Sequence, residues 1–198
     1  MIQAYMAENE LNQSYSDCFR PTSNRILFRT VTGMAIMAGQ QLTGINFIYY
    51  YGTTFFQRSG VSDPFLISVI TNVVNVVFTI PGIWLVDRAG RRSLLLIGAA
   101  GMLTCQYIVA IVGISVKSTD MAGQSVLIAF VCIYIVFFAS SWGPVPWVVT
   151  GEIYPLSVRA KAMSMSTASN WLWNTAIGFA STLKRFHVSP FDANLPIA

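Results

Sequence analysis

Five long stretches without a charged side chain constrain this sequence more than any other feature. Each stretch is long enough to cross about 30 Å of hydrocarbon as a helix. The stretches are 30–57, 64–86, 93–116, 121–151 and 162–183. In lipid a helix pairs every backbone amide within its own segment, and none of the stretches alternates like a strand of a membrane β-barrel. We therefore predict an all-α integral membrane protein with five transmembrane helices.

Composition agrees with a lipid environment. The chain is 54% hydrophobic and only 10% charged, which is too apolar for a water-exposed surface. Its net charge of +4 comes from small basic clusters between the apolar stretches, a pattern that argues against nucleic-acid binding. Its three cysteines form no CxxC pair, so neither a metal site nor a disulfide framework is indicated. The expected partner is the lipid bilayer.

The basic clusters also predict the orientation of the helices, because cytoplasmic connections are rich in lysine and arginine. The clusters before the first, third and fifth stretches contain Arg20, Arg25, Arg29, Arg88, Arg91, Arg92, Arg159 and Lys161. We expect residues 1–29 to be a cytoplasmic segment and 30–183 to be the transmembrane bundle. Lys184 and Arg185 break the pattern, so 184–198 is expected to be an aberrant or truncated tail.

The first stretch carries three carboxamides at membrane depth, Gln40, Gln41 and Asn46, with Gly39 and Gly44 beside them. Unsatisfied polar groups are costly in lipid, so these side chains need a reason to be there. One reason is hydrogen bonding between helices that approach closely at the glycines. The other is a wet cavity, because a carboxamide offers a donor and an acceptor to a neutral polyhydroxylated ligand. The glycines would let the helix unwind locally.

Two other stretches carry paired carboxamides. Asn72 and Asn75 are three residues apart in the second stretch, so they share a helix face that we expect to point inward. Asn170 and Asn174 share a face of the fifth stretch, with Trp171 between them. These positions extend the candidate cavity to two more helices.

The fourth stretch contains a predicted helix break. Pro144 and Pro146 each remove a backbone donor and clash with the preceding turn, so the helix must kink or break there. Broken helices mark binding sites in transporters. Trp147 beside the break offers an apolar face for a sugar ring and an N–H for a hydroxyl, although a tryptophan of the membrane interface is the alternative interpretation.

Two of the cytoplasmic connections, 87–92 and 151–161, share one design: an acid near one helix end and an arginine near the next. Ion pairs across these ends would form when the cytoplasmic side is closed and break when it opens. The alternative is an orientation signal with a stray acid. The residues of this predicted gate are Asp87, Arg91, Arg92, Glu152 and Arg159.

Taken together, these motifs resemble the sugar porter family of the major facilitator superfamily. The segments that carry the resemblance are 39–46, which is similar to the family's helix seven, 87–92, similar to its loop between helices eight and nine, and 143–147, similar to its helix ten. The amino-acid sequences of segments 49–56 and 148–155 are most similar to those of fungal hexose transporters. The resemblance implies the C-terminal helical bundle of a twelve-helix transporter, incomplete, with helices seven to eleven present. The missing N-terminal helical half is an expected partner.

The resemblance also implies roles for individual residues. Positions that contact the sugar are matched by Gln40, Gln41, Asn46, Asn75, Trp147 and Asn174, and more weakly by Asn170 and Trp171. Tyr50 and Tyr51 match aromatic positions that close the cavity from outside. One departure is Ala139, which stands where mammalian glucose facilitators have a glutamate.

The implied function is alternating-access transport of a monosaccharide, a hexose and foremost glucose, by a full-length protein in the plasma membrane. Two alternatives stay open: a transporter-like glucose sensor, and an inactive truncated fragment. An enzyme is not indicated, because the only histidine, His187, lies in the tail and no nucleophile or carboxylate pair is suitably placed. No cofactor is implied, and proton coupling stays open.

Overall fold

The computed structural model describes residues 14–19, 25–49, 64–115, 121–156 and 158–188, and all regular structure within these ranges is helical. The elements are the 3₁₀ turn η1 (Tyr15–Phe19), α2 (Ile26–Leu42), α4 (Pro64–Ala89), α5 (Arg91–Ser115), α6 (Met121–Phe137), the π-helical turn η2 (Phe138–Trp142), α7 (Val145–Ile153) and α8 (Arg159–Val188). The predicted all-α class is therefore confirmed.

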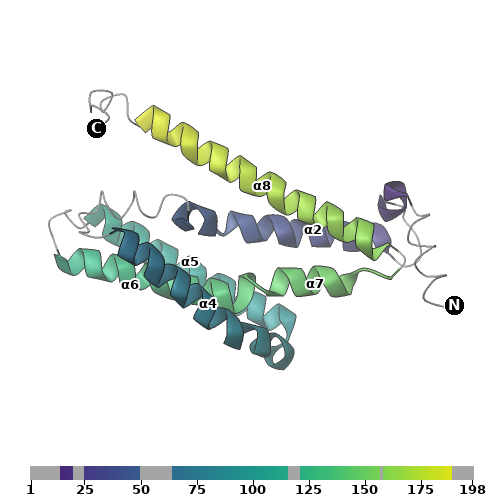
Figure 1. The fold of residues 1–198 in the computed structure, drawn as a ribbon, viewed down its shortest axis with the longest axis horizontal. Coiled ribbons are helices and arrows are strands. Elements are labelled where there is room, and N and C mark those ends of the chain that lie inside the picture. The colour runs from purple at the N-terminus through teal and green to yellow at the C-terminus, as the bar shows by residue number, and fades with distance from the viewer. Residues whose placement is uncertain (1–13, 20–24, 50–63, 116–120, 157, 189–198) are drawn as a thin grey trace.

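The long helices run along the longest axis of the molecule (Figure 1). α8 packs along α2, while α4, α5 and α6 pack together with η2. α7 continues beyond η2 and contacts both α2 and α5, so it joins the two groups. The predicted stretch 121–151 thus corresponds to α6, η2 and α7 in succession, and 162–183 lies within the longer α8.

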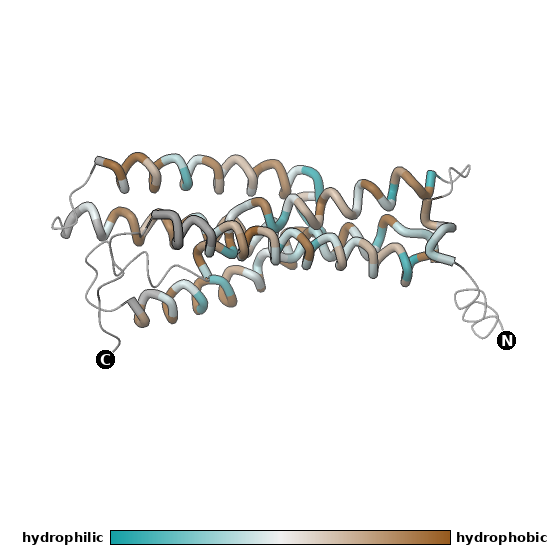
Figure 2. Tube along the Cα trace, turned by 90° about the horizontal axis from the view of Figure 1, so that it is seen from above, coloured by the Kyte–Doolittle hydropathy of each residue, from teal (hydrophilic) through white to brown (hydrophobic). Residues whose placement is uncertain are grey.

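Three described segments are long and apolar enough to cross a membrane: Ser68–Ala89, Arg91–Ile114 and Ser125–Ile153. Their mean hydropathies are 1.9, 2.0 and 2.2. The outer faces of α4 and α5 expose bulky apolar side chains such as Val76, Ile80 and Ile114. Figure 2 shows hydrophobic residues distributed along the whole length of the helices. Such faces suit hydrocarbon as the solvent, whereas the buried carboxamides Gln40, Gln41 and Asn170 lie on α2 and α8.

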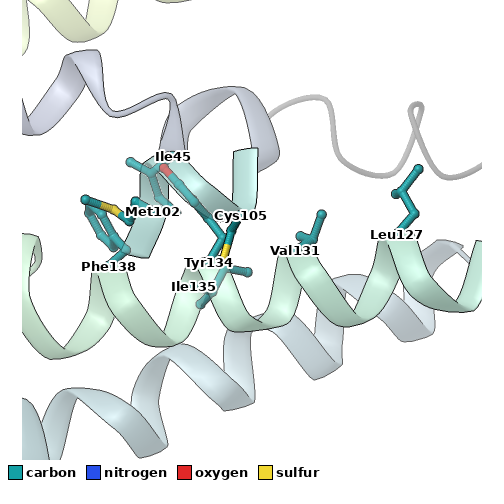
Figure 3. Close-up of a cluster of buried hydrophobic side chains, with 8 residues drawn as sticks. All are labelled: Ile45, Met102, Cys105, Leu127, Val131, Tyr134, Ile135 and Phe138. Carbon is teal, nitrogen blue, oxygen red and sulfur yellow. The ribbon is translucent and has the colours of Figure 1, made fainter. Parts of the chain in front are cut away.

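The largest buried cluster joins α5, α6 and the short segment that follows α2 (Figure 3). Its members are Ile45, Met102, Cys105, Leu127, Val131, Tyr134, Ile135 and Phe138. This cluster holds the segment after α2 against the opposite group of helices. It therefore fixes where the first candidate motif lies.

Close helix contacts at small residues bring η2 deep into the bundle. A Cβ added to Gly82 on α4 would lie 2.7 Å from the Ser140 Cα, and one added to Gly98 on α5 would overlap the Ser141 hydroxyl. Small residues at such crossings allow backbones to approach in membrane bundles. The glycines of α4 and α5 thus let the break of the fourth stretch lie directly against these two helices.

Candidate functional site

The site begins at a break in the first membrane helix. α2 ends at Leu42, Thr43 and Gly44 form a turn, and residues 45–49 are helical again. Gly44 has φ 86°, a left-handed conformation that a residue without Cβ adopts at little cost. The sequence-based expectation that glycine lets this helix unwind is therefore confirmed. The break places Gln40 and Gln41 in the last turn before it and Asn46 just after it.

Four carboxamides meet at this break, and we call Gln40, Gln41, Asn46 and Asn170 the carboxamide cluster. Asn170 of α8 donates its Nδ2 to the Gln40 Oε1 at 2.8 Å, and its Oδ1 accepts from the Gln41 Nε2 at 2.7 Å. Asn46 donates its Nδ2 to the Gln41 Oε1. Asn170 is therefore the bridge between the two glutamines, a role that its sequence position alone does not reveal.

The cluster is buried and well paired. Gln40, Gln41 and Asn170 are 6%, 7% and 4% exposed. Each of their amide groups has a partner, because the Gln40 Nε2 also donates to the carbonyls of Trp142 and Gly143, at 2.7 and 3.0 Å. Such pairing removes most of the cost of polar groups at this depth. The arrangement can exchange an internal hydrogen bond for one to a neutral hydroxylated ligand.

The fourth stretch breaks as its prolines predict. The helix widens into the π-helical turn η2, in which the Gly143 N–H donates to the Phe138 carbonyl at 2.8 Å, and α7 begins beyond Pro144. π-bulges frequently occur at functional sites. The Trp142 and Gly143 carbonyls, which accept hydrogen bonds from the Gln40 Nε2, lie at this break. Two interrupted helices, α2 and the fourth stretch, are therefore joined directly through one glutamine.

The second polar contact lies between α4 and the segment after the α2 break. The Asn75 Nδ2 donates to the Tyr49 hydroxyl, and both side chains are half-buried. Asn72 differs from Asn75, because it is exposed and donates to the Ser68 carbonyl of its own helix at 2.8 Å. The two asparagines of the shared face thus have different environments.

The remaining candidate ligand contacts lie on faces that the described part of the chain leaves uncovered. Trp147 on α7 and Trp171 on α8 are 41% and 62% exposed, and Asn174 is half-buried one turn beyond Asn170. These side chains lie outside the carboxamide cluster but on the helices that flank it. Tyr50 and Tyr51, the predicted outer gate, lie outside the described residues.

The predicted cytoplasmic gate gathers at one end of the bundle. Arg91 donates to the Glu152 Oε1 at 2.6 Å and lies 3.9 Å from the Asp87 carboxylate, so it connects both loops. Arg159 donates to the Tyr154 carbonyl at 3.3 Å instead of joining that pair. Arg92 is exposed. We call the groups of Arg29, Asp87, Arg91, Glu152 and Arg159 the charged end.

Arg29 is a member of the charged end that sequence reasoning assigned only to orientation. Its Nη1 donates to the Ile153 carbonyl at 2.9 Å, which ties α2 to the end of α7. Beneath it, the buried Tyr154 hydroxyl is hydrogen-bonded to Ser166 at 2.5 Å. Burial raises the pKa of the Tyr154 phenol above its ordinary value. The charged end thus rests on a neutral, tightly packed layer.

Sequence reasoning also missed two donors on the opposite helices. Gln106 of α5 and Tyr134 of α6 both donate to the Thr43 carbonyl, at 2.7 and 2.8 Å. Gln106 is a polar residue in an apolar stretch, and that was the available signal. Tyr134 offered no such signal in the sequence, because tyrosine is common in membrane helices.

Comparisons with known proteins identify the family of this chain. The family model described as sugar (and other) transporter matches residues 1–186. The probable glucose transporter rco-3 of Neurospora crassa is 51% identical over 89% of this chain, and the high glucose sensor RGT2 of Saccharomyces cerevisiae is 48% identical over 80%. The chain spans 31% and 21% of the lengths of these two relatives.

Solved structures give the same fold. A double-tryptophan mutant of XylE matches 78% of this chain with a TM-score of 0.69 at 32% identity, over 32% of that structure's chain. The inward-open conformation of the xylose transporter XylE from E. coli matches 84% with a TM-score of 0.64 at 30% identity, over 33% of its chain. The five helices thus form part of a major facilitator bundle, in accordance with the resemblance in the motifs. The chain belongs to the sugar (and other) transporter family.

Proposed function

We propose that this chain forms part of a plasma-membrane transporter that carries a neutral hexose, foremost glucose, by alternating access. The observation that carries the proposal is the carboxamide cluster, which is buried at the meeting point of two interrupted helices. Interrupted helices of this kind bind substrates near the midplane of secondary transporters. The names of the relatives, a probable glucose transporter and a high glucose sensor, support a hexose as the substrate.

The chemistry of the cluster favours an uncharged, hydroxyl-rich ligand. All four members are neutral, and each carboxamide can both donate and accept. The bond between Asn46 and Gln41 is the one most readily exchanged, since Asn46 is only half-buried. A sugar hydroxyl that accepts from Asn46 and donates to Gln41 would keep both groups satisfied. We expect Trp147, Trp171 and Asn174 to complete this wall of the cavity.

The charged end supplies the inner gate in this proposal. The Arg91–Glu152 ion pair holds the ends of α5 and α7 together, which corresponds to a closed cytoplasmic side. Its separation would open that side. Tyr50 and Tyr51 are proposed to close the outer side. Because the two gates bias one equilibrium, a sugar that binds one state more tightly shifts the balance between them.

The test is uptake of labelled glucose by the full-length transporter, in which this chain is completed by its own gene or by the matching segments of the Neurospora relative. We expect Gln41→Ala and Asn75→Ala each to lower uptake at least roughly tenfold at normal surface amount, the size of one or two lost hydrogen bonds. Asn72→Ala is the matched control, because Asn72 bonds only its own helix. Unchanged uptake in both test variants would overturn the site.

A glucose sensor is the second candidate, supported by the 48% identity to RGT2. A sensor binds the sugar and changes conformation without net flux. The two functions are separated by measuring saturable uptake and sugar-dependent gene expression in the same cells. Binding and expression without flux would favour the sensor.

The isolated chain is a separate case. The proposed ligand contacts Trp147 and Trp171 lie on faces that the described residues leave exposed, so we propose that the chain alone does not transport. Saturable, stereospecific glucose flux through reconstituted isolated chain would contradict this proposal.

A further inference from the structure

Two polar side chains from separate helices converge on one carbonyl at the break of α2. The Gln106 Nε2 of α5 and the Tyr134 hydroxyl of α6 both donate to the Thr43 oxygen, at 2.7 and 2.8 Å. Carbonyls in the last turn of a helix lack the usual donor four residues later and must find partners elsewhere. Here the partners come from the group of helices opposite α8, so the break is fastened from the side away from Asn170.

The two hydrogen bonds to the Thr43 carbonyl lie next to Gly44, the residue with a left-handed backbone in this turn. Gly44 follows Thr43 with φ 86°, and a Cβ added to it would lie 3.1 Å from the Gln106 Nε2. Tyr134 is 1% exposed and belongs to the buried cluster with Ile45. Figure 3 shows its side chain reaching from α6 toward the segment that carries Ile45. The tyrosine is therefore held in place by packing, and the turn that follows α2 lies against its hydroxyl.

Beside this turn there is open space. A groove of about 580 Å³ is lined by Gly44, Phe47 and Ile48 on one side and by residues of α5 and α6, including Gln106 and Tyr134, on the other. The segment 45–49 borders this groove and also carries Asn46 and Tyr49, which reach Gln41 and Asn75. A small rotation about Thr43 would therefore change both polar contacts at once.

We propose that Gln106 and Tyr134 are positioning residues that hold the Thr43 carbonyl as the pivot of segment 45–49, and so set how tightly Asn46 and Tyr49 close on the sugar. Neither side chain touches the carboxamide cluster through a described hydrogen bond. Their effect on affinity passes through the backbone of Thr43 and Gly44. The inference rests on the proposed transport function.

The two donors to the Thr43 carbonyl can partly replace each other. If either is lost, the other still satisfies the carbonyl, although in a looser geometry. If both are lost, the carbonyl faces an apolar groove without a protein donor, which is far more costly. The pair should therefore show a double-variant effect larger than the product of the single effects.

The experiment measures glucose uptake by the full-length transporter carrying Gln106→Met, Tyr134→Phe or both. Methionine keeps the length of glutamine without its donor, and phenylalanine removes only the hydroxyl. We expect each single variant to raise KM roughly threefold to tenfold, with Vmax per surface molecule changing less, and the double variant to exceed the product. Thr104→Val is the control, because the exposed Thr104 bonds only its own helix through Ala100.

The outcomes separate three situations. A KM within twofold of wild type in all variants, or a fall in surface amount alone, would overturn the pivot and leave a purely structural role. If wild type itself shows no uptake, the proposed function fails instead. Should the double variant not reach the surface, glucose binding by purified Tyr134→Phe decides the question: a weakened Kd supports the pivot and an unchanged Kd overturns it.

Discussion

The carboxamide cluster and the charged end differ in both charge and exposure to solvent. The first consists of neutral groups, and three of its four members, Gln40, Gln41 and Asn170, are at most 7% exposed. The second uses full charges near water, where the side chains of Arg91 and Glu152 are 40% and 53% exposed. Burying unpaired polar groups is costly, whereas exposed ion pairs contribute little to stability.

This difference teaches where the molecule is sensitive. A buried network must be complete, because removing one member leaves a buried polar atom of each partner without its hydrogen bond. An exposed ion pair can separate at small cost, which is what a gate needs. We therefore expect large effects from changes in the cluster, intermediate effects from packing beneath the charged end, and small stability effects from the charges themselves.

The largest effect is expected for Asn170→Leu. Leucine has a similar volume but removes both the N–H that donates to the Gln40 Oε1 and the oxygen that accepts from the Gln41 Nε2. Two buried carboxamides would lose a partner, at about 1–3 kcal/mol each. We expect glucose uptake to fall more than roughly 100-fold per surface molecule. Uptake and cell-surface labelling in the same cells check this prediction.

Thr175→Val is the matched control on the same helix, since the exposed Thr175 bonds only the Trp171 carbonyl. Its uptake should stay at the wild-type level. Equal behaviour of the two variants would mean that the cluster is not the sensitive region.

A packing change beneath the charged end should come next. A Cβ added to Gly33 would overlap the Tyr154 hydroxyl and lie 3.0 Å from the Ser166 Oγ, and both side chains are fully buried. Gly33→Ala should therefore destabilise the transporter by about 1–3 kcal/mol. A lower melting temperature of the purified protein would show it. Gly151→Ala, which meets nothing within 4 Å, should melt like wild type.

The smallest stability effect is expected for the ion pair. Arg91→Ala and Glu152→Ala should each change stability by less than about 1 kcal/mol, because the pair is exposed and screened by salt. Uptake kinetics should nevertheless shift up to roughly fivefold, if the pair biases the proposed inner gate. The double charge swap, Arg91→Glu with Glu152→Arg, should restore the wild-type rate. Failure of the swap together with a large loss of stability would make the charged end structural.

Much of the architecture could be predicted from the sequence, because lipid leaves few choices. A stretch without charges and long enough to span the bilayer has to be helical, so the stretches predicted the all-α class that the described residues show. Gly44 and the prolines at 144 and 146 likewise predicted the two breaks, since their backbone preferences are local. The motifs around these breaks carried the family resemblance that the comparisons confirm.

The pairing of the polar side chains could not be predicted in the same way. The partners are distant along the chain: Asn170 lies 130 positions from Gln40, and Tyr134 lies 91 from Thr43. Helix periodicity places a residue on a face but says nothing about which face of another helix meets it. Asn72 and Asn75 show the limit, because one shared face gave one residue bonded within its own helix and one that reaches Tyr49.

The sequence by itself thus determined the membrane environment, the helical class, the helix breaks and the family. These properties follow from hydropathy, local backbone chemistry and the amino-acid sequences of the motifs. Only the tertiary structure decided that Asn170 bridges the two glutamines, that Arg91 rather than Arg159 pairs with Glu152, and that Thr43 is fastened by Gln106 and Tyr134. The reason is physical: hydrogen bonds and ion pairs depend on distances of about 3 Å between atoms, and such distances are set only when the helices pack.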